Sequence, residues 1–185
     1  NCHVNVLQTQ DHPQFKTYAE ELKWLTTDKT RMKWVANTIK DISSSGNTLI
    51  LVDRISAGEI LEEQIDDAVF VSGATKNTDR KEQYDEISTA TNKVIIATYG
   101  VAAVGINIPR IFNLVLIEPG KSFVRVIQSI GRGIRKAEDK DSVQIWDITS
   151  SCKFAKRHLG ARKKFYKEAN YPYNIEKINY ENPYT

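Results

Sequence analysis

A glutamine and two arginines at helical spacing are the residues of this sequence most suited to chemistry. Gln128, Arg132 and Arg135 fit the pattern QxxGRxxR. Because residues three and four positions apart lie on one face of a helix, their side chains form a single polar stripe. Arginine offers phosphate oxygens a fixed fork of donors and stays charged at any working pH. The stripe predicts contact with a phosphoryl group; the alternative is an ordinary solvated helix face.

A second pair of candidates follows two apolar blocks. Arg54 comes shortly after residues 49–52, and Thr98 directly follows residues 94–97. A hydroxyl and a helix N-terminus that follow a strand are both good donors to phosphate. These positions predict contacts with a nucleic-acid backbone, and the alternative is a plain helix cap and turn.

The elements that must position these residues alternate between strands and helices. Short solid blocks of β-branched residues are typical of strands buried on both faces of a parallel sheet, and they occur at residues 49–52, 69–71, 94–97, 114–117 and 143–148. Helical patterns separate them at residues 55–65, 79–90, around 101 and 122–135. This order predicts an α/β fold with a doubly wound parallel sheet, in which ligands gather at the carboxyl ends of the strands.

Different patterns flank this central unit. Residues 15–42 predict two helices, the second capped by Asp28, so we expect an N-terminal helical or linker segment over 1–45 and the main domain over 46–150. Residues 152–170 predict a basic helix, and the tail beyond it has an extended character, which makes 151–185 a third segment. Lys156, Arg162 and Lys163 on that helix are candidates for phosphate contacts, unless the charges form a solvated face.

Composition excludes several classes of protein. The net charge of +3 does not by itself indicate a nucleic-acid binder. Two cysteines without CxxC or HxxxH spacing predict reduced thiols and no metal site. No apolar run approaches the roughly 18 residues of a spanning helix, and no signal peptide is visible, so we expect a soluble cytoplasmic protein. The chain begins at Asn1 and its only methionine is Met32, so we expect a fragment.

One motif resembles a phosphate-binding loop without completing it. Gly120, Lys121 and Ser122 match the end of GxxxxGK[ST], but Val115 stands where the first glycine is required. We therefore interpret these residues as a turn that caps the helix after it. The sequence also contains no DExH or DExD stretch to hold magnesium. A self-sufficient P-loop enzyme is thereby excluded, and we expect half of an ATP site to be missing.

The motifs together resemble those of superfamily 2 helicases. QxxGRxxR resembles motif VI, residues 48–54 resemble motif IV, and residues 97–109 resemble motif V, in the order that the superfamily has them. The resemblance covers roughly residues 46–148 and implies a C-terminal RecA-like domain. Within the superfamily the chain is most similar to UvsW-type recombination helicases of T-even bacteriophages.

The resemblance implies roles for individual residues. Arg135 would be the arginine finger on the γ-phosphate, with Arg132 beside it and Gln128 organising the interface. Gly105 and Asn107 would also face the nucleotide. Asn107 departs from the aspartate of many relatives, so its nucleotide contact would be neutral. ATP and Mg²⁺ would be bound jointly with a first RecA-like domain.

The implied function is that of one half of a motor. The chain would be the C-terminal half of an ATP-dependent DNA helicase or translocase in recombination or repair, inactive as an ATPase alone. Its partners would be single-stranded or branched DNA and the upstream RecA-like domain, and its location the host cytoplasm if a phage encodes it. The alternatives are a nucleic-acid-binding module without ATP coupling, or the motor of an RNA helicase or restriction enzyme.

Overall fold

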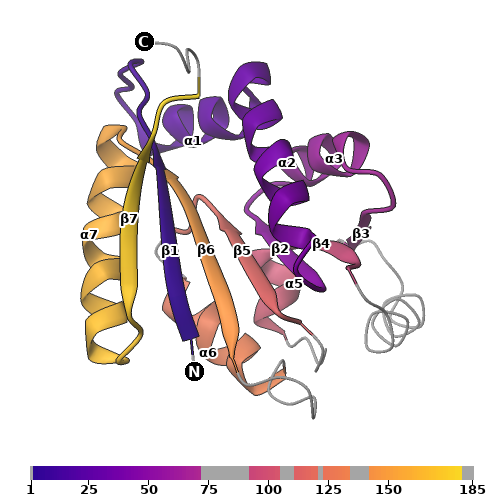
Figure 1. Ribbon diagram of the computed structural model, residues 1–185. Coiled ribbons are helices and arrows are strands. Elements are labelled where there is room, and N and C mark those ends of the chain that lie inside the picture. The colour runs from indigo at the N-terminus through magenta and orange to yellow at the C-terminus, as the bar shows by residue number, and fades with distance from the viewer. Residues whose placement is uncertain (1, 72–91, 105–110, 121–122, 134–141, 181–185) are drawn as a thin grey trace.

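The described residues fold around one seven-stranded sheet, in which every described strand pair is parallel. The structure is a computed structural model that describes residues 2–71, 92–104, 111–120, 123–133 and 142–180, and Figure 1 shows its arrangement. The strand order is β3-β4-β2-β5-β6-β1-β7. The strands are β1 (Cys2–Thr9), β2 (Thr48–Val52), β3 (Val69–Val71), β4 (Val94–Thr98), β5 (Asn113–Ile117), β6 (Val143–Ser150) and β7 (Tyr173–Ile178).

Helices cover both faces of this sheet. They are α1 (Tyr18–Thr27), α2 (Lys29–Ser43), α3 (Ile55–Gln64), α5 (Tyr99–Ala103), α6 (Phe123–Gly133) and α7 (Lys153–Glu168). Figure 1 shows α7 alongside β7 and β1, and α2 and α3 together on the other side of the sheet. None of the helices in the described part of the chain is long and apolar enough to cross a membrane.

The two faces follow from the alternation of side chains along each strand. In β2, Leu49 and Leu51 belong to one buried cluster, whereas Ile50 and Val52 belong to another. The first cluster includes apolar residues of α5, α6 and α7, and the second those of α2 and α3. Central strands of a doubly wound sheet are covered on both faces, which explains why β2 reads as an unbroken apolar run.

The predicted doubly wound α/β fold is confirmed. The predicted strands at 49–52, 69–71, 94–97, 114–117 and 143–148 all lie in the sheet. The helices expected at 55–65, around 101, at 122–135 and at 152–170 are α3, α5, α6 and α7. The helix expected at 79–90 lies outside the described residues.

Each flanking segment adds a strand to the sheet, and the strand in the N-terminal segment was not predicted. Strand β1 lies between β6 and β7, with Val4 opposite both Ile145 and Tyr173. The sheet therefore extends into both segments that the sequence set apart, 1–45 and 151–185. The pairing joins residues more than a hundred positions apart, so no local pattern announces it.

The two N-terminal helices form as predicted, and one of them is tied to α7. Asp28 caps α2, with its carboxylate accepting a hydrogen bond from the backbone N–H of Arg31. Glu21 of α1 is buried, and its carboxylate accepts from the backbone N–H groups of Phe154 and Ala155 in the first turn of α7. A carboxylate at a helix N-terminus accepts from backbone N–H groups that have no partner within the helix, and it interacts favourably with the helix dipole. Glu21 therefore fixes α1 at the start of α7.

Candidate nucleotide and nucleic-acid interface

Arg54 and Thr98 lie side by side at the carboxyl edge of the sheet. Val52 and Thr98 are partners in the β2–β4 ladder, and Arg54 follows two residues after Val52. Arg54 is the N-cap of α3 in extended conformation, and its guanidinium is 3.8 Å from the carboxylate of Asp53. Thr98 is the N-cap of α5, with its hydroxyl accepting from the N–H of Val101 at 3.2 Å. The fold thus brings the two predicted backbone contacts together.

Helices α5 and α6 form one packed unit. The hydroxyl of Ser129 contacts the carbonyl oxygens of Ala102 and Ala103 at 3.4 and 3.3 Å. This contact joins the QxxGRxxR segment to the middle of the segment that resembles motif V. Gln128, one residue earlier, is exposed on α6. Two stretches that the sequence linked only by resemblance therefore share one surface.

The remaining members of the predicted nucleotide site are only partly described. Arg132 lies in the last turn of α6, where the backbone is described and the side chain is not. Arg135, Gly105 and Asn107 lie outside the described residues. The turn expected at Gly120 to Ser122 is described at Gly120 alone, whose carbonyl accepts a hydrogen bond from the backbone N–H of Phe123, the first residue of α6.

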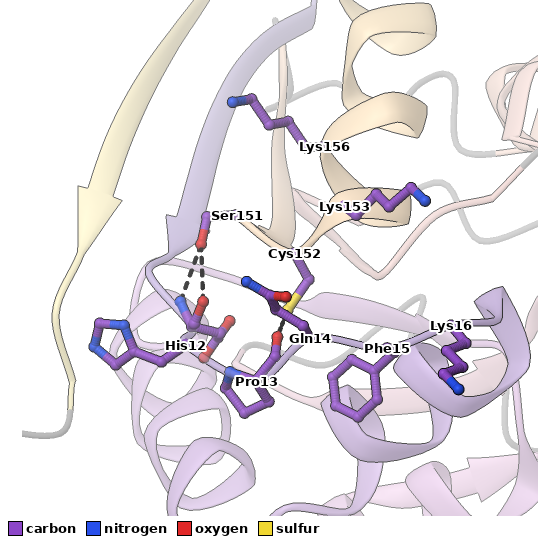
Figure 2. A pocket seen from close by; sticks show the side chains of 10 residues that line it. His12, Pro13, Gln14, Phe15, Lys16, Ser151, Cys152, Lys153 and Lys156 are labelled. Carbon is purple, nitrogen blue, oxygen red and sulfur yellow. Dashed lines mark hydrogen bonds between the residues drawn. The ribbon is translucent and has the colours of Figure 1, made fainter.

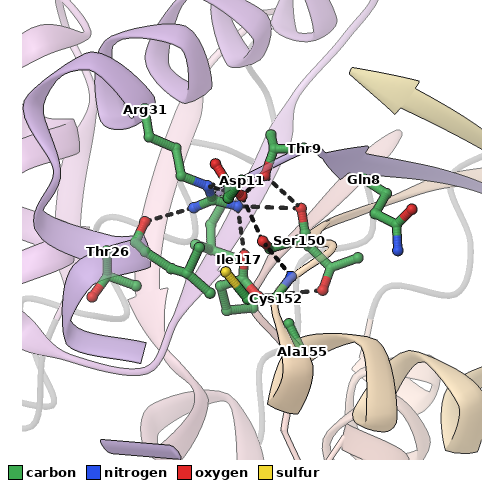
Figure 3. A network of polar contacts seen from close by, with 12 residues as sticks. Gln8, Thr9, Asp11, Thr26, Arg31, Ile117, Ser150, Cys152 and Ala155 are labelled. Carbon is green, nitrogen blue, oxygen red and sulfur yellow. Dashed lines mark hydrogen bonds and ion pairs between the residues drawn. The ribbon is translucent and has the colours of Figure 1, made fainter. Parts of the chain in front are cut away.

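A buried polar network lies at the carboxyl ends of β1, β5 and β6 (Figure 3). Its centre is Arg31 of α2, which is fully buried. The Arg31 guanidinium donates to Glu118 at 2.5 Å, to the hydroxyl of Thr9 at 3.1 Å and to the carbonyl of Thr149 at 3.2 Å. It also lies 3.7 Å from the carboxylate of Asp11. Such a buried cation requires this set of partners, since an unpaired one would be very costly.

The network affects the ionisation of Glu118. Burial raises the pKa of Glu118 to about 7, against the attraction of Arg31 and Arg162, which lowers it. The negative charges of Asp147 and Asp11 also raise the pKa, by less than burial does. Burial of a carboxyl group favours its neutral form, which is the main physical reason for the shift.

A second buried ion pair corrects one sequence-based expectation. Arg162 is 2% exposed, and its guanidinium makes two hydrogen bonds to the carboxylate of Asp147 at 2.7 and 2.9 Å. A third hydrogen bond, at 2.8 Å, goes to the carbonyl of Pro119 in the turn before α6. Burial alone lowers the pKa of Arg162, but the charge and hydrogen bonds of Asp147 outweigh it, and the pKa is raised. Arg162 therefore faces the core, and its predicted role as a nucleic-acid contact is wrong.

Apart from Arg162, the two predicted contacts on α7 lie toward its outer side. Lys156 is exposed and Lys163 is half-buried. The inner side docks through Leu159 and Tyr166, both buried, and through Phe165, whose ring meets that of Phe123 on α6 edge-on at 5.3 Å. The helix thus docks through apolar and aromatic residues and leaves most of its cations on the surface.

Arg162 was predicted on the surface, and no functional role was predicted for Glu118 or Arg31. Position 162 falls in a helical stripe with 155, 159 and 166, all of which are buried. Spacing of four, three and four residues puts these positions on one helix face, so the sequence carried a signal that Arg162 points inward. Glu118 carried a weaker signal as an acid directly after a buried strand. No local pattern marks Arg31, because its partners come from three distant strands.

A doubly wound parallel sheet covered on both faces, with polar residues gathered at its carboxyl edge, is the arrangement of a RecA-like lobe. Residues 30–137 match the family described as the helicase conserved C-terminal domain, and the chain belongs to this family.

Two viral helicases are similar in sequence. The chain is 29% identical over 155 residues to the ATP-dependent DNA helicase uvsW of Enterobacteria phage T4. The matched residues make up 81% of the chain and 31% of that protein. The chain is 30% identical over 137 residues to putative helicase 22 of Sulfolobus islandicus filamentous virus, with coverage of 72% and 24%. The chain therefore spans about a third or less of the length of these relatives.

Solved structures share the fold. The crystal structure of T4 UvsW superposes with a TM-score of 0.83 at 23% identity and covers 96% of the chain and 42% of that structure. S. cerevisiae Dbp5 bound to RNA and ADP BeF3 superposes with a TM-score of 0.60 at 14% identity, over 97% of the chain and 42% of that structure.

Proposed function

We propose that this chain is the C-terminal RecA-like lobe of an ATP-dependent DNA helicase or translocase. The observation that carries the proposal is the joining of α5 to α6 through Ser129, which gives the motif V and motif VI segments one common surface. A surface built from both motifs is what a lobe needs to close on a nucleotide held by a second lobe. The chain is inactive as an ATPase by itself under this proposal.

The nucleotide side of the lobe consists of Gln128, Arg132 and Arg135, together with Gly105 and Asn107. The described part of this side fits a polyanion, because neither α5 nor α6 contains an acidic residue. The carboxylates that Mg²⁺ requires would accordingly come from the first lobe. Bound ATP would supply the free energy of movement.

The two arginines would contribute directed hydrogen bonds to phosphate oxygens as well as positive charge. Arg135 would donate to the γ-phosphate when the lobes close, and Arg132 would contact the phosphates beside it. A guanidinium fork stabilises the charge that develops on the transferring phosphoryl group, and a trans-acting finger is typically worth about 10³ to 10⁵ in turnover.

The nucleic-acid side is the carboxyl edge. Arg54 and Thr98 would contact phosphates of a nucleic-acid strand, since Thr98 ends β4 and Arg54 follows two residues after the neighbouring strand β2. Lys156 and Lys163 of α7 would add a more distant contribution. A backbone track of this kind carries affinity rather than sequence specificity, as a translocating motor requires.

DNA is the proposed substrate, because the T4 relative is described as an ATP-dependent DNA helicase. Single-stranded or branched DNA, a role in recombination or repair, and a cytoplasmic location complete the proposal. An RNA helicase and the motor of a restriction enzyme use the same motifs, and comparison of DNA and RNA as activators of ATP hydrolysis separates them.

The test uses Arg135→Lys in the protein joined to a first RecA-like lobe. Lysine keeps the positive charge but loses the bidentate fork, so ATP hydrolysis should fall by at least about 10³-fold while DNA affinity stays within about twofold. Wild-type hydrolysis by this variant would sink the finger assignment and favour a binding module without ATP coupling.

A further inference from the structure

A pocket of about 700 Å³ lies at the carboxyl ends of β1 and β6, outside the motif segments. Figure 2 shows it between the stretch from His12 to Lys16 and the first turn of α7. Three exposed lysines, Lys16, Lys153 and Lys156, line it together with the half-buried Phe15. Its volume is in the range of small-ligand sites, and cations around an aromatic ring suit a nucleotide better than an apolar ligand.

The pocket has no free negative charge to oppose an anion among its described lining residues. Asp11 lines it, but its carboxylate is fully buried and accepts hydrogen bonds from Thr9, Ser150 and Tyr180. Cys152 also lines it, and burial raises the pKa of this thiol to about 11, so that it stays protonated and neutral. The lysines therefore determine the electrostatic character of the pocket.

An aromatic and basic surface connects the pocket to the proposed DNA track. The ring of Tyr18, at the start of α1, packs against Phe154 and His158 of α7 at 6.3 and 4.8 Å between centroids. The Tyr18 hydroxyl also lies close to the backbone of Gly120, beside the end of β5, since a Cβ added to this glycine would be 3.0 Å from it. Lys153 lies over the Phe154 ring. The surface thus runs from the ends of the central strands to the pocket.

The distance along the edge suits one continuous strand of nucleic acid. Arg54 follows β2, and Lys153 follows β6, two strands further along the sheet order. Neighbouring strands lie about 4.8 Å apart, so the strand ends that carry these residues are separated by about 10 Å. A single strand bound at Arg54 and Thr98 reaches the pocket within a few nucleotides.

We propose that this pocket is a subsite for one nucleotide unit of single-stranded nucleic acid, with backbone phosphates on Lys16, Lys153 and Lys156 and a base against Phe15. The proposal rests on the carboxyl edge being the nucleic-acid track. It adds Lys16, Lys153 and Phe15 to that track and extends it across α1 and α7.

The test compares two double variants of the 185-residue chain that each remove two exposed lysine charges. The pocket variant is Lys16→Gln with Lys153→Gln, and its control on α2 is Lys33→Gln with Lys40→Gln. Binding of a fluorescent oligothymidylate is measured by anisotropy across a salt titration. Loss of two phosphate contacts should reduce the slope of log K against log salt by about 1.4 and weaken binding about tenfold, whereas the control should change neither.

Phe15→Leu tests the base contact separately. Leucine keeps an apolar side chain against Trp24, whose ring lies 5.9 Å from that of Phe15, but offers no flat face. Affinity should fall about fivefold without a change in the salt slope, because stacking does not release counterions. An unchanged thermal midpoint of the variant shows that the fold is intact.

The possible failures are distinguishable. If the wild-type chain does not bind the strand at all, the proposed track is wrong and the pocket falls with it. If the wild-type chain binds, but the pocket and control variants behave alike, the pocket proposal alone is overturned. Displacement of the strand by ADP in the wild-type chain but not in the pocket variant would show a site for free nucleotide, which also overturns it.

Discussion

Replacing Arg162 by methionine should lower the free energy of unfolding of the domain far more than replacing any surface cation on the same helix. Methionine is unbranched and apolar, so it fills the space of the aliphatic part of the Arg162 side chain but does not replace the guanidinium. It removes both hydrogen bonds to Asp147 and the one to Pro119. The carboxylate of Asp147, which is fully buried, would retain the hydroxyl of Tyr166 as its donor.

The expected magnitude follows from this loss of partners. Breaking a buried ion pair on one side costs about 3–5 kcal/mol, because the remaining charge is left uncompensated. Two charge-assisted hydrogen bonds of about 1.5–3 kcal/mol each give a similar figure. Adding Asp147→Asn to Arg162→Met removes the unpaired charge and should recover part of the loss.

Urea unfolding monitored by circular dichroism measures the change, with Lys164→Met as the matched control. Lys164 is exposed on the same helix, so its replacement should change the free energy of unfolding by less than about 0.5 kcal/mol. Equal slopes against urea would show that only stability has changed. Equal stability of Arg162→Met and Lys164→Met would refute the assignment of Arg162 to the core.

Three further substitutions test other parts of the structure. Glu118→Gln should remove a pH dependence of the free energy of unfolding. Because the pKa of Glu118 in the folded protein is raised to about 7, its stabilising effect is present below the ordinary pKa of 4.5 and is lost as pH rises through about 7. Urea midpoints measured at both ends of this pH window give the size of the effect. Gly58→Ala should lower stability by about 1–3 kcal/mol, since the added Cβ would lie 2.5 Å from Cζ of Phe70. Gly160 is exposed on α7 and an added Cβ would meet nothing within 4 Å, so Gly160→Ala should raise stability by up to about 1 kcal/mol. Thermal unfolding of both glycine variants measures these changes. A Gly58→Ala variant more stable than Gly160→Ala would contradict the packing.

The central strands and their helices could be predicted because their signals are local. Residues 49–52 of β2 and 114–117 of β5 are apolar without interruption, and Asp28 marks the start of α2 by its capping chemistry. Strands β1 and β7 could not be predicted in the same way. β7 is mostly exposed at the sheet edge, and its register is set by β1 rather than by its own apolar content.

The candidate site was predictable in its surface residues and not in its buried ones. Arg54 and Thr98 follow strand ends, and an edge shared by parallel strands brings such residues together. Arg31 reaches Glu118 and Thr149 only after three strand ends have assembled, so its role depends on tertiary structure. The same holds for Arg162, although its helical spacing contained the signal.

The measurement that tests the central claim most directly is ATP hydrolysis by this chain alone and by the chain joined to a first RecA-like lobe, each with and without single-stranded or branched DNA. The split-site account predicts no turnover by the chain alone and DNA-stimulated turnover by the joined protein. Turnover by the isolated chain would contradict it, because a complete ATP site would then lie within these 185 residues.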